Sequence, residues 1–210
     1  STFFAGNPLK GKAPLLVSAL MYTNPMMIYF GQELGEKGMD AEGFSGEDGR
    51  TTIFDYWTVD TIRRWRNNGK FDQKLLTEDE LSLQEYYAKV LNICNSSEAV
   101  KEGEFYDLMY VNPQLQKQYT FVRHSEKETL LVIANFASQD TEITINVPEH
   151  LFEYYGIKEN TACEWTDLLS GSQITTAFSS NMPTKLNVPS WGGCILKMKS
   201  VKKAGKKTKS

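Results

Sequence analysis

The chain has 210 residues, of which 40% are hydrophobic and 23% are charged, as is typical of a protein with an ordinary globular core. Its formal net charge of −3 provides no general attraction to nucleic acid or to anionic lipid. No run of about 18 apolar residues occurs, so we predict no membrane span. We therefore expect neither nucleic acid nor a membrane among its partners.

The apolar residues of the first hundred positions follow mostly helical spacing. Pro14 suits the first turn of a helix, and Leu15, Leu16 and Ala19 follow at helical intervals. This helix should end by Asn24, because the residue before a proline avoids the helical region. The five apolar residues 26–30 then predict a strand that is covered on both faces, as strands of parallel sheets are.

Residues 31–60 form a long polar segment containing six glycines, and loops of that length are usually functional or disordered. Thr77 and Glu80 have the spacing of a capping box, which predicts a helix running to about Cys94. A second, short helix is expected to stop at Gly103.

Beyond Gly103 the apolar period changes from helical spacing to two. Residues 142–147 alternate cleanly between apolar and polar, as a half-buried strand does. Residues 119–124 and 129–136, joined by the charged turn 125–128, predict a hairpin. Further strands are expected at 105–111, 162–169, 173–178, 185–188 and 194–199. Seven or eight short strands predict an antiparallel β-sandwich, followed by a disordered basic tail at 201–210.

Several other chemistries find little support in the residues. The three cysteines show no CxxC spacing, so we expect small buried hydrophobes and neither disulfides nor zinc. The two histidines belong to no nucleophile–base arrangement. The glycines after residue 30 do not have the dinucleotide-binding spacing. Acidic residues gather in the same loop without the spacing of a calcium loop, and we predict no metal and no cofactor; they are Glu36, Asp40, Glu42, Glu47 and Asp48.

The segment NPMMIYFGQELG at 24–35 resembles the last barrel strand and the following loop of the α-amylase family of glycoside hydrolases. Ile28, Tyr29, Gly31, Gln32, Glu33 and Gly35 match the core of that motif, while Asn24 replaces a small residue.

Further segments resemble the same family in the same order along the chain. Residues 48–57 are similar to its Asp-Gly-Arg loop, and 82–105 to the last barrel helix with the link that leaves the barrel. Residues 120–136, with the pair Asn135 and Phe136, resemble two strands of its C-terminal sandwich, and 167–171 and 188–198 resemble the final strands.

The resemblance implies an α+β chain in two parts. Residues 1–100 would be the carboxyl-terminal end of a (β/α)8-barrel catalytic domain, with one barrel strand, and 101–200 an all-β sandwich domain. The catalytic carboxylates of this family lie on earlier strands, so none is expected in this chain. It would then be part of an enzyme acting on the α-glucosidic linkages of starch-like glucans, inactive alone. Substrate contacts are expected from Gln32, Glu33, Asp48, Arg50 and Trp57.

Two alternatives stay open. Glu33 could serve only as a hydrogen-bond partner that holds its loop. The chain could also be a non-catalytic glycan-binding or accessory module that contacts glycan through an exposed aromatic such as Trp57. A buried strand at 26–30 without sheet neighbours would leave backbone groups unpaired, so we expect the first 95 residues to rearrange, to associate with a second copy or to occur together with the missing part.

Overall fold

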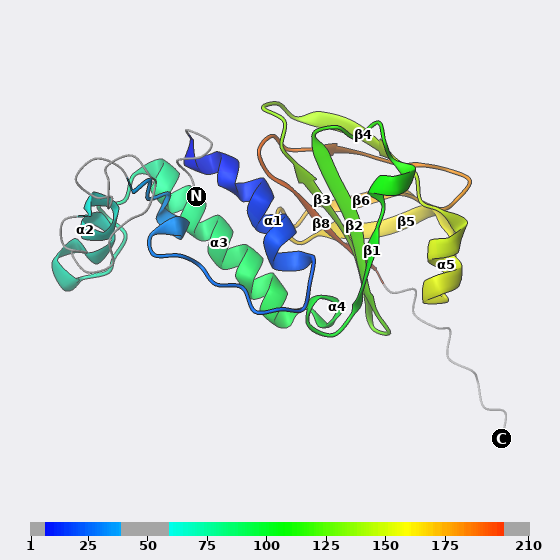
Figure 1. Ribbon diagram of the computed structural model, residues 1–210, viewed down its shortest axis with the longest axis horizontal. Helices are drawn as coiled ribbons and strands as arrows, with labels where there is room; N and C mark the ends of the chain where they lie inside the picture. Colours follow the sequence, from blue (N-terminus) through cyan, green and yellow to red (C-terminus); the bar gives the residue numbers. More distant parts are fainter. Residues whose placement is uncertain (1–6, 39–58, 200–210) are drawn as a thin grey trace, which may run out of the picture.

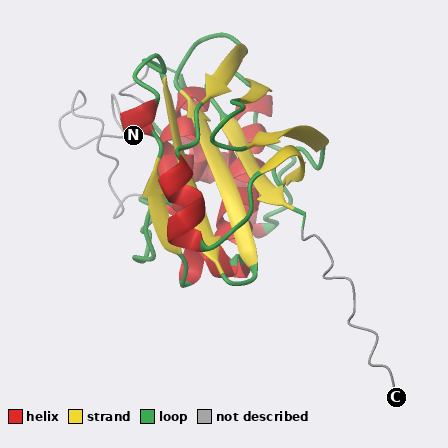
Figure 2. Ribbon diagram, turned by 90° about the vertical axis from the view of Figure 1, so that its right-hand side faces the viewer, coloured by secondary structure: helices red, strands yellow, loops and turns green. Residues whose placement is uncertain are grey.

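The computed structural model of the chain describes residues 7–38 and 59–199. It is a mixed fold in which a group of helices lies against a large antiparallel sheet, as the α+β class predicts (Figure 1). Helices α1 and α3 run side by side and cover one face of that sheet (Figures 1 and 2). No helix among the described residues is long and apolar enough to cross a membrane.

The helical part confirms the main sequence signals. Thr77 Oγ1 accepts a hydrogen bond from the Glu80 amide at 3.3 Å, and Glu80 Oε2 accepts one from the Thr77 amide at 2.9 Å, so the predicted capping box starts α3. The helices of this part are η2 (Pro8–Gly11), α1 (Lys12–Leu20), η3 (Gln32–Leu34), α2 (Asp60–Arg66), η6 (Asn67–Gly69), α3 (Glu78–Ser96) and α4 (Glu98–Lys101).

Two antiparallel sheets follow. The larger has the strand order β1-β2-β3-β8-β5-β6, and β4 pairs with β7 in the smaller. The predicted hairpin is confirmed as β2 and β3, which pair from Gln118↔Asn135 to Ser125↔Glu128. The elements of this part are β1 (Glu104–Asp107), η7 (Met109–Val111), β2 (Gln118–Ser125), β3 (Glu128–Asn135), β4 (Thr141–Ile145), α5 (Glu149–Tyr155), β5 (Asn160–Asp167), β6 (Gln173–Phe178), β7 (Thr184–Val188) and β8 (Gly193–Met198).

The large sheet is buried on both faces. Leu131 and its partner Leu196 face the small sheet, in a core cluster that also contains Trp165. Val132 and its partner Ile195 belong to the second cluster, with the apolar residues of α1 and α3. Every residue of β3 is buried, because helices cover one face and strands the other. The buried free thiols of Cys163 and Cys194 behave as small hydrophobes, as predicted.

Three sequence predictions need correction. The strand expected at 105–111 ends at Asp107 as β1, and Met109–Val111 is the 3-10 helix η7. Residues 26–30 form no strand: Met26 and Ile28 pack against the helical core, while Met27 is 82% exposed. Half-buried and exposed side chains still alternate along this segment as they do in a strand. No described strand lies beside it to supply ladder hydrogen bonds. Conversely, α5 interrupts the part predicted to be all strand. Its signals are local, since it follows Pro148 and ends at Gly156, which has a left-handed φ of +63°.

Candidate functional site

The candidate site begins at the tight turn 31–38, which we call the Gln-Glu turn. Its 3-10 helix η3 lies between Gly31 and Gly35, whose φ values are +75° and +76°. A Cβ on Gly31 would lie 2.7 Å from the Glu36 Cβ, and one on Gly35 would lie 2.6 Å from the Pro8 Cβ. Both the left-handed backbone and the close packing therefore require glycine at these positions, which accounts for their spacing in the sequence.

Gln32 fixes the turn to helix α3. Its side-chain Oε1 accepts a hydrogen bond from the Tyr29 amide at 3.1 Å, and its Nε2 donates to the Tyr87 hydroxyl at 3.0 Å. Burial raises the pKa of Tyr87 above its ordinary value; the Gln32 hydrogen bond opposes this and the charge of Glu33 adds to it. Both polar ends of Gln32 are thus used within the protein, so the side chain holds the turn in place.

The two carboxylates of the turn differ in their surroundings. Glu36 is buried, and its oxygens accept hydrogen bonds from the Gly38 amide at 2.7 Å and from Thr61 Oγ1 at 2.6 Å. Glu33 is half-buried, and its carboxylate makes no hydrogen bond with any residue that the structure describes. Glu36 therefore braces the turn against α2, whereas Glu33 is the carboxylate available to a ligand.

An ion pair holds the neighbouring helices α2 and α3 together. Arg64 on α2 binds both oxygens of Glu80 through Nε, at 3.1 and 3.0 Å, and makes a further contact through Nη2. Burial acts to raise the pKa of Glu80, but the hydrogen bonds from Arg64 and from the Thr77 amide outweigh it and hold that pKa below its ordinary value. Such a charged, two-pronged contact orients α2 on the start of α3.

The predicted site residues are only partly placed. Gln32 and Glu33 lie together beside Tyr87, and Gln32, not Glu33, makes the hydrogen bonds that hold the loop. Asp48, Arg50 and Trp57 lie outside the described residues. No group of three or more potential metal ligands occurs within 7–38 and 59–199. The sequence gives no link between the Tyr87 hydroxyl and Gln32, because 55 positions separate the two residues.

The residues that carry the resemblance in the second half have structural roles. Asn135 is fully buried, and its Nδ2 donates to the carbonyls of Val188 and Pro189, both at 3.2 Å. The Asp167 carboxylate accepts hydrogen bonds from the amides of Leu169 and Ile195, both at 3.1 Å. These side chains hold turns of the sheet part through hydrogen bonds to the main chain. The motifs that contain them therefore have a structural role.

No protein-family model matches the chain, and neither does any curated protein. Solved structures do. AmyP in complex with maltose matches 90% of this chain with a TM-score of 0.59 at 14% identity, and 34% of that chain is covered. An α-amylase from Geobacillus thermoleovorans, complexed with acarbose, matches 93% of this chain with a TM-score of 0.55 at 12% identity, and 34% of the Geobacillus chain is covered.

A mutant of trehalulose synthase MutB matches 91% of this chain with a TM-score of 0.54 at 17% identity, with 38% of that chain covered. In fold, the chain therefore resembles part of the α-amylase family of glycoside hydrolases, as its sequence motifs predict. It spans about a third of the length of the solved chains it matches.

Proposed function

We propose that this chain is the carboxyl-terminal part of a glycoside hydrolase that acts on the α-glucosidic linkages of starch-like glucans. The observation that carries the proposal is the Gln-Glu turn: the motif that resembles the family folds into a glycine-bounded turn with Gln32 anchored and Glu33 unengaged. The fold likeness supports it, since AmyP was solved with maltose and the Geobacillus enzyme with acarbose.

In this proposal the chain supplies the supporting end of the active site. Gln32 and Glu36 hold the turn, and Glu33 offers its carboxylate to a sugar hydroxyl. Asp48, Arg50 and Trp57 add contacts from the segment that follows. The pair of catalytic carboxylates, which a retaining enzyme places about 5–5.5 Å apart, comes from the part of the enzyme upstream of this chain.

The extended segment 26–30 has its place in the same proposal. Met27 is 82% and Tyr29 43% exposed, while Met26 and Ile28 pack against the core cluster that contains α1 and α3. An exposed, extended segment of alternating apolar residues is a template for strand pairing. We expect it to pair with upstream strands in the whole enzyme, and with a second copy of this chain when those strands are missing.

A two-part activity assay tests the proposal. The coding sequence upstream of Ser1 is read, and the enzyme extended by it is compared with the 210-residue chain on soluble starch and p-nitrophenyl α-maltosides. The extended enzyme should turn over both substrates, and the chain alone should turn over neither. In the extended enzyme, Glu33→Gln should raise KM and leave kcat nearly unchanged, because Glu33 contacts substrate without reacting.

A second candidate is a non-catalytic glycan-binding or accessory module. The observation that favours it is the presence of exposed aromatic side chains on the sheet part, including Tyr110 at 62%. Affinity electrophoresis of the chain in starch gels separates the two. Retardation that is lost in Trp57→Ala, together with an extended enzyme that shows no turnover, would replace the hydrolase proposal by this one.

A further inference from the structure

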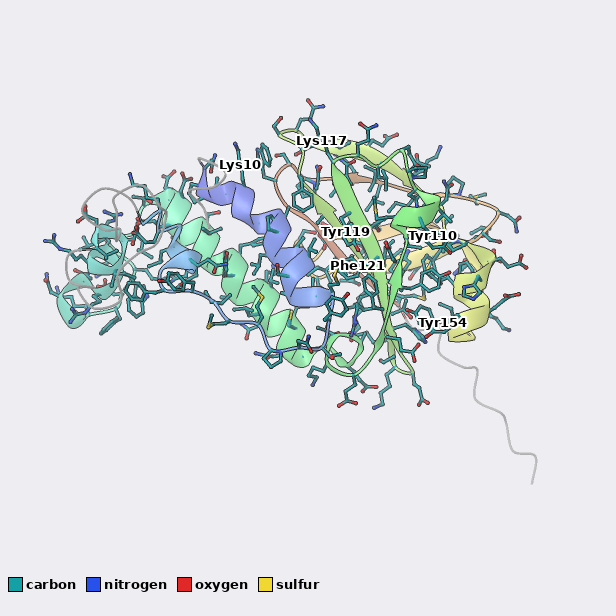
Figure 3. The ribbon with its side chains drawn as sticks, viewed as in Figure 1. Lys10, Tyr110, Lys117, Tyr119, Phe121 and Tyr154 are labelled. Atoms are coloured by element: carbon teal, nitrogen blue, oxygen red, sulfur yellow. The ribbon has the colours of Figure 1, made fainter. Side chains whose placement is uncertain are left out.

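Five aromatic side chains gather on the sheet part, far from the Gln-Glu turn. This tyrosine cluster consists of Tyr106 on β1, Tyr110 in η7, and His150, Tyr154 and Tyr155 on α5. Figure 3 labels Tyr110 and Tyr154 at the end of the molecule opposite α2. Because α2 carries Thr61, which contacts the turn, the cluster cannot be part of the site already described.

The cluster is open to solvent and forms a shallow depression. Tyr110 is 62% and Tyr154 53% exposed. With Tyr106, His150, Phe105 and Asp107 they line a depression of about 370 Å³. Leu151 and Phe152 of α5 face the core, so the same helix places His150 and Tyr154, four residues apart, on its outer side. Tyr106 and Tyr155 also pack against the core, whereas Tyr110, His150 and Tyr154 are exposed and are not needed for that packing.

Hydrogen bonds fix the rings relative to one another. The Tyr106 hydroxyl lies 2.9 Å from the Tyr110 hydroxyl and 2.9 Å from His150 Nδ1. The rings of His150 and Tyr154 stack with centroids 6.0 Å apart and an interplanar angle of 23°. The arrangement is therefore held before any ligand arrives, which lowers the entropic cost of binding.

The chemistry of this surface suits a sugar. Aromatic faces cover the apolar C–H face of a pyranose ring, and hydroxyl, imidazole and carboxylate groups at the rim exchange hydrogen bonds with its hydroxyls. Asp107 supplies the carboxylate, one oxygen of which accepts the Met109 amide at 2.8 Å. An isolated exposed tyrosine needs no explanation, but a preorganised group of them around a shallow depression marks an interaction surface.

We propose that the tyrosine cluster is a second glycan-binding site, which holds an α-glucan chain on the sheet part by stacking on Tyr110 and Tyr154. This inference rests on the proposed function for its choice of an α-linked glucan. It adds a surface that keeps the polymer on the enzyme away from the site of cleavage.

Isothermal titration of the full 210-residue chain with maltoheptaose tests it, with cellohexaose as the β-linked comparison. The wild-type chain should bind maltoheptaose and not cellohexaose. Tyr110→Ala and Tyr154→Ala should each weaken binding about three- to tenfold, and the double variant should abolish it. Phe136→Ala is the matched control, since Phe136 is 38% exposed and lies outside the cluster. Unchanged thermal melting shows that each variant is folded.

The other outcomes overturn the proposal in distinct ways. Binding that survives in the double variant but is lost in Trp57→Ala assigns the glycan contact to Trp57 and rejects the tyrosine cluster as the site. No binding of maltoheptaose, with starch turnover by the extended enzyme intact, rejects the second site and leaves the proposed function standing. Binding of cellohexaose alone rejects the α-glucan assignment and counts against the proposed function as well.

Discussion

Arg123 Nη1 donates a hydrogen bond to the main-chain carbonyl of Met21 over 3.0 Å, across 102 positions of the chain. Its other nitrogens donate to the carbonyls of Ala99, Val100 and Gly103 at 2.7–3.0 Å. The side chain is 2% exposed, and a buried guanidinium is tolerated only when its donors are satisfied. One residue of β2 therefore joins the ends of α1 and α4 to the sheet.

Replacing this side chain should destabilise the whole chain. Arg123→Met keeps the apolar stem but leaves four carbonyls without their donor, so we expect the free energy of unfolding to fall by about 3 kcal/mol. Urea titration followed by circular dichroism measures it. Arg63→Met, at a side chain that is 64% exposed, is the control and should change stability by less than about 0.5 kcal/mol. A loss below about 1 kcal/mol for Arg123→Met would contradict the role assigned to it.

Neighbouring glycines provide a matched pair. A Cβ on Gly193 would lie 2.0 Å from the Ile133 carbonyl oxygen and 2.5 Å from Leu16 Cδ1, whereas one on Gly192 meets nothing closer than 3.5 Å. Gly193→Ala should therefore cost about 3 kcal/mol or prevent folding, because β8 would have to move away from β3 and α1. Gly192→Ala should melt within a few degrees of the wild type. Equal melting temperatures for the two variants would contradict the close approach of Gly193 to the Ile133 carbonyl oxygen.

How far the sequence predicts this fold depends on the range of the signal. The capping box of α3 and the hairpin of β2 and β3 are local patterns, and both are confirmed. The packing of α1 and α3 on the sheet is not local. The apolar run at residues 130–134 is the sequence signal that accompanies the complete burial of β3. Only the structure shows that helices cover one face of this strand.

The candidate site is predicted less well, for the same reason. The sequence indicates only a long glycine-containing loop after residue 30, and the structure shows that its start is the 3-10 helix η3. The partner of Gln32 is Tyr87, 55 positions away, and the tyrosine cluster joins β1 to α5, a helix that strand periodicity concealed. A signal was present in the four-residue spacing of Tyr106 and Tyr110 and of His150 and Tyr154.

Acid should weaken the junction between the sheet and α4. Glu128 accepts hydrogen bonds from Ser97 Oγ at 2.5 Å and the Ala99 amide at 3.1 Å, and its ion pair with Lys197 spans 2.6 Å. Burial acts to raise the pKa of Glu128, but these partners outweigh it and hold the pKa below its ordinary value of 4.5.

The lowered pKa of Glu128 sets how the stability of the protein depends on pH. A carboxyl whose pKa is lower in the folded state stabilises the protein above the unfolded pKa, and this contribution is lost as the pH falls through the folded value. Glu128→Gln should therefore lower the free energy of unfolding by about 1–3 kcal/mol at pH 7, with the deficit shrinking towards pH 3. Urea titrations at pH 7, 5 and 3 measure it. A deficit that is constant with pH would exclude an ionised Glu128 as its source.

The extended segment 26–30 should make the isolated chain associate. With Met27 82% exposed on a segment that has no described strand beside it, we expect light scattering to show dimers or larger species whose fraction grows with concentration. Met27→Lys places a charge on that surface and should shift the chain towards monomer. Met182→Lys, at a methionine that is 48% exposed on the sheet part, is the matched control. A wild-type chain that is monomeric at every concentration would refute the association.

Under the proposed function, this chain supports α-glucan cleavage without performing it. Side-by-side turnover of soluble starch by the 210-residue chain and by the enzyme extended upstream of Ser1 tests that claim most directly. We predict release of reducing sugar by the extended enzyme and none above buffer by the chain alone. Turnover by the purified chain alone, or an extended enzyme that leaves α-glucans uncut, would contradict it.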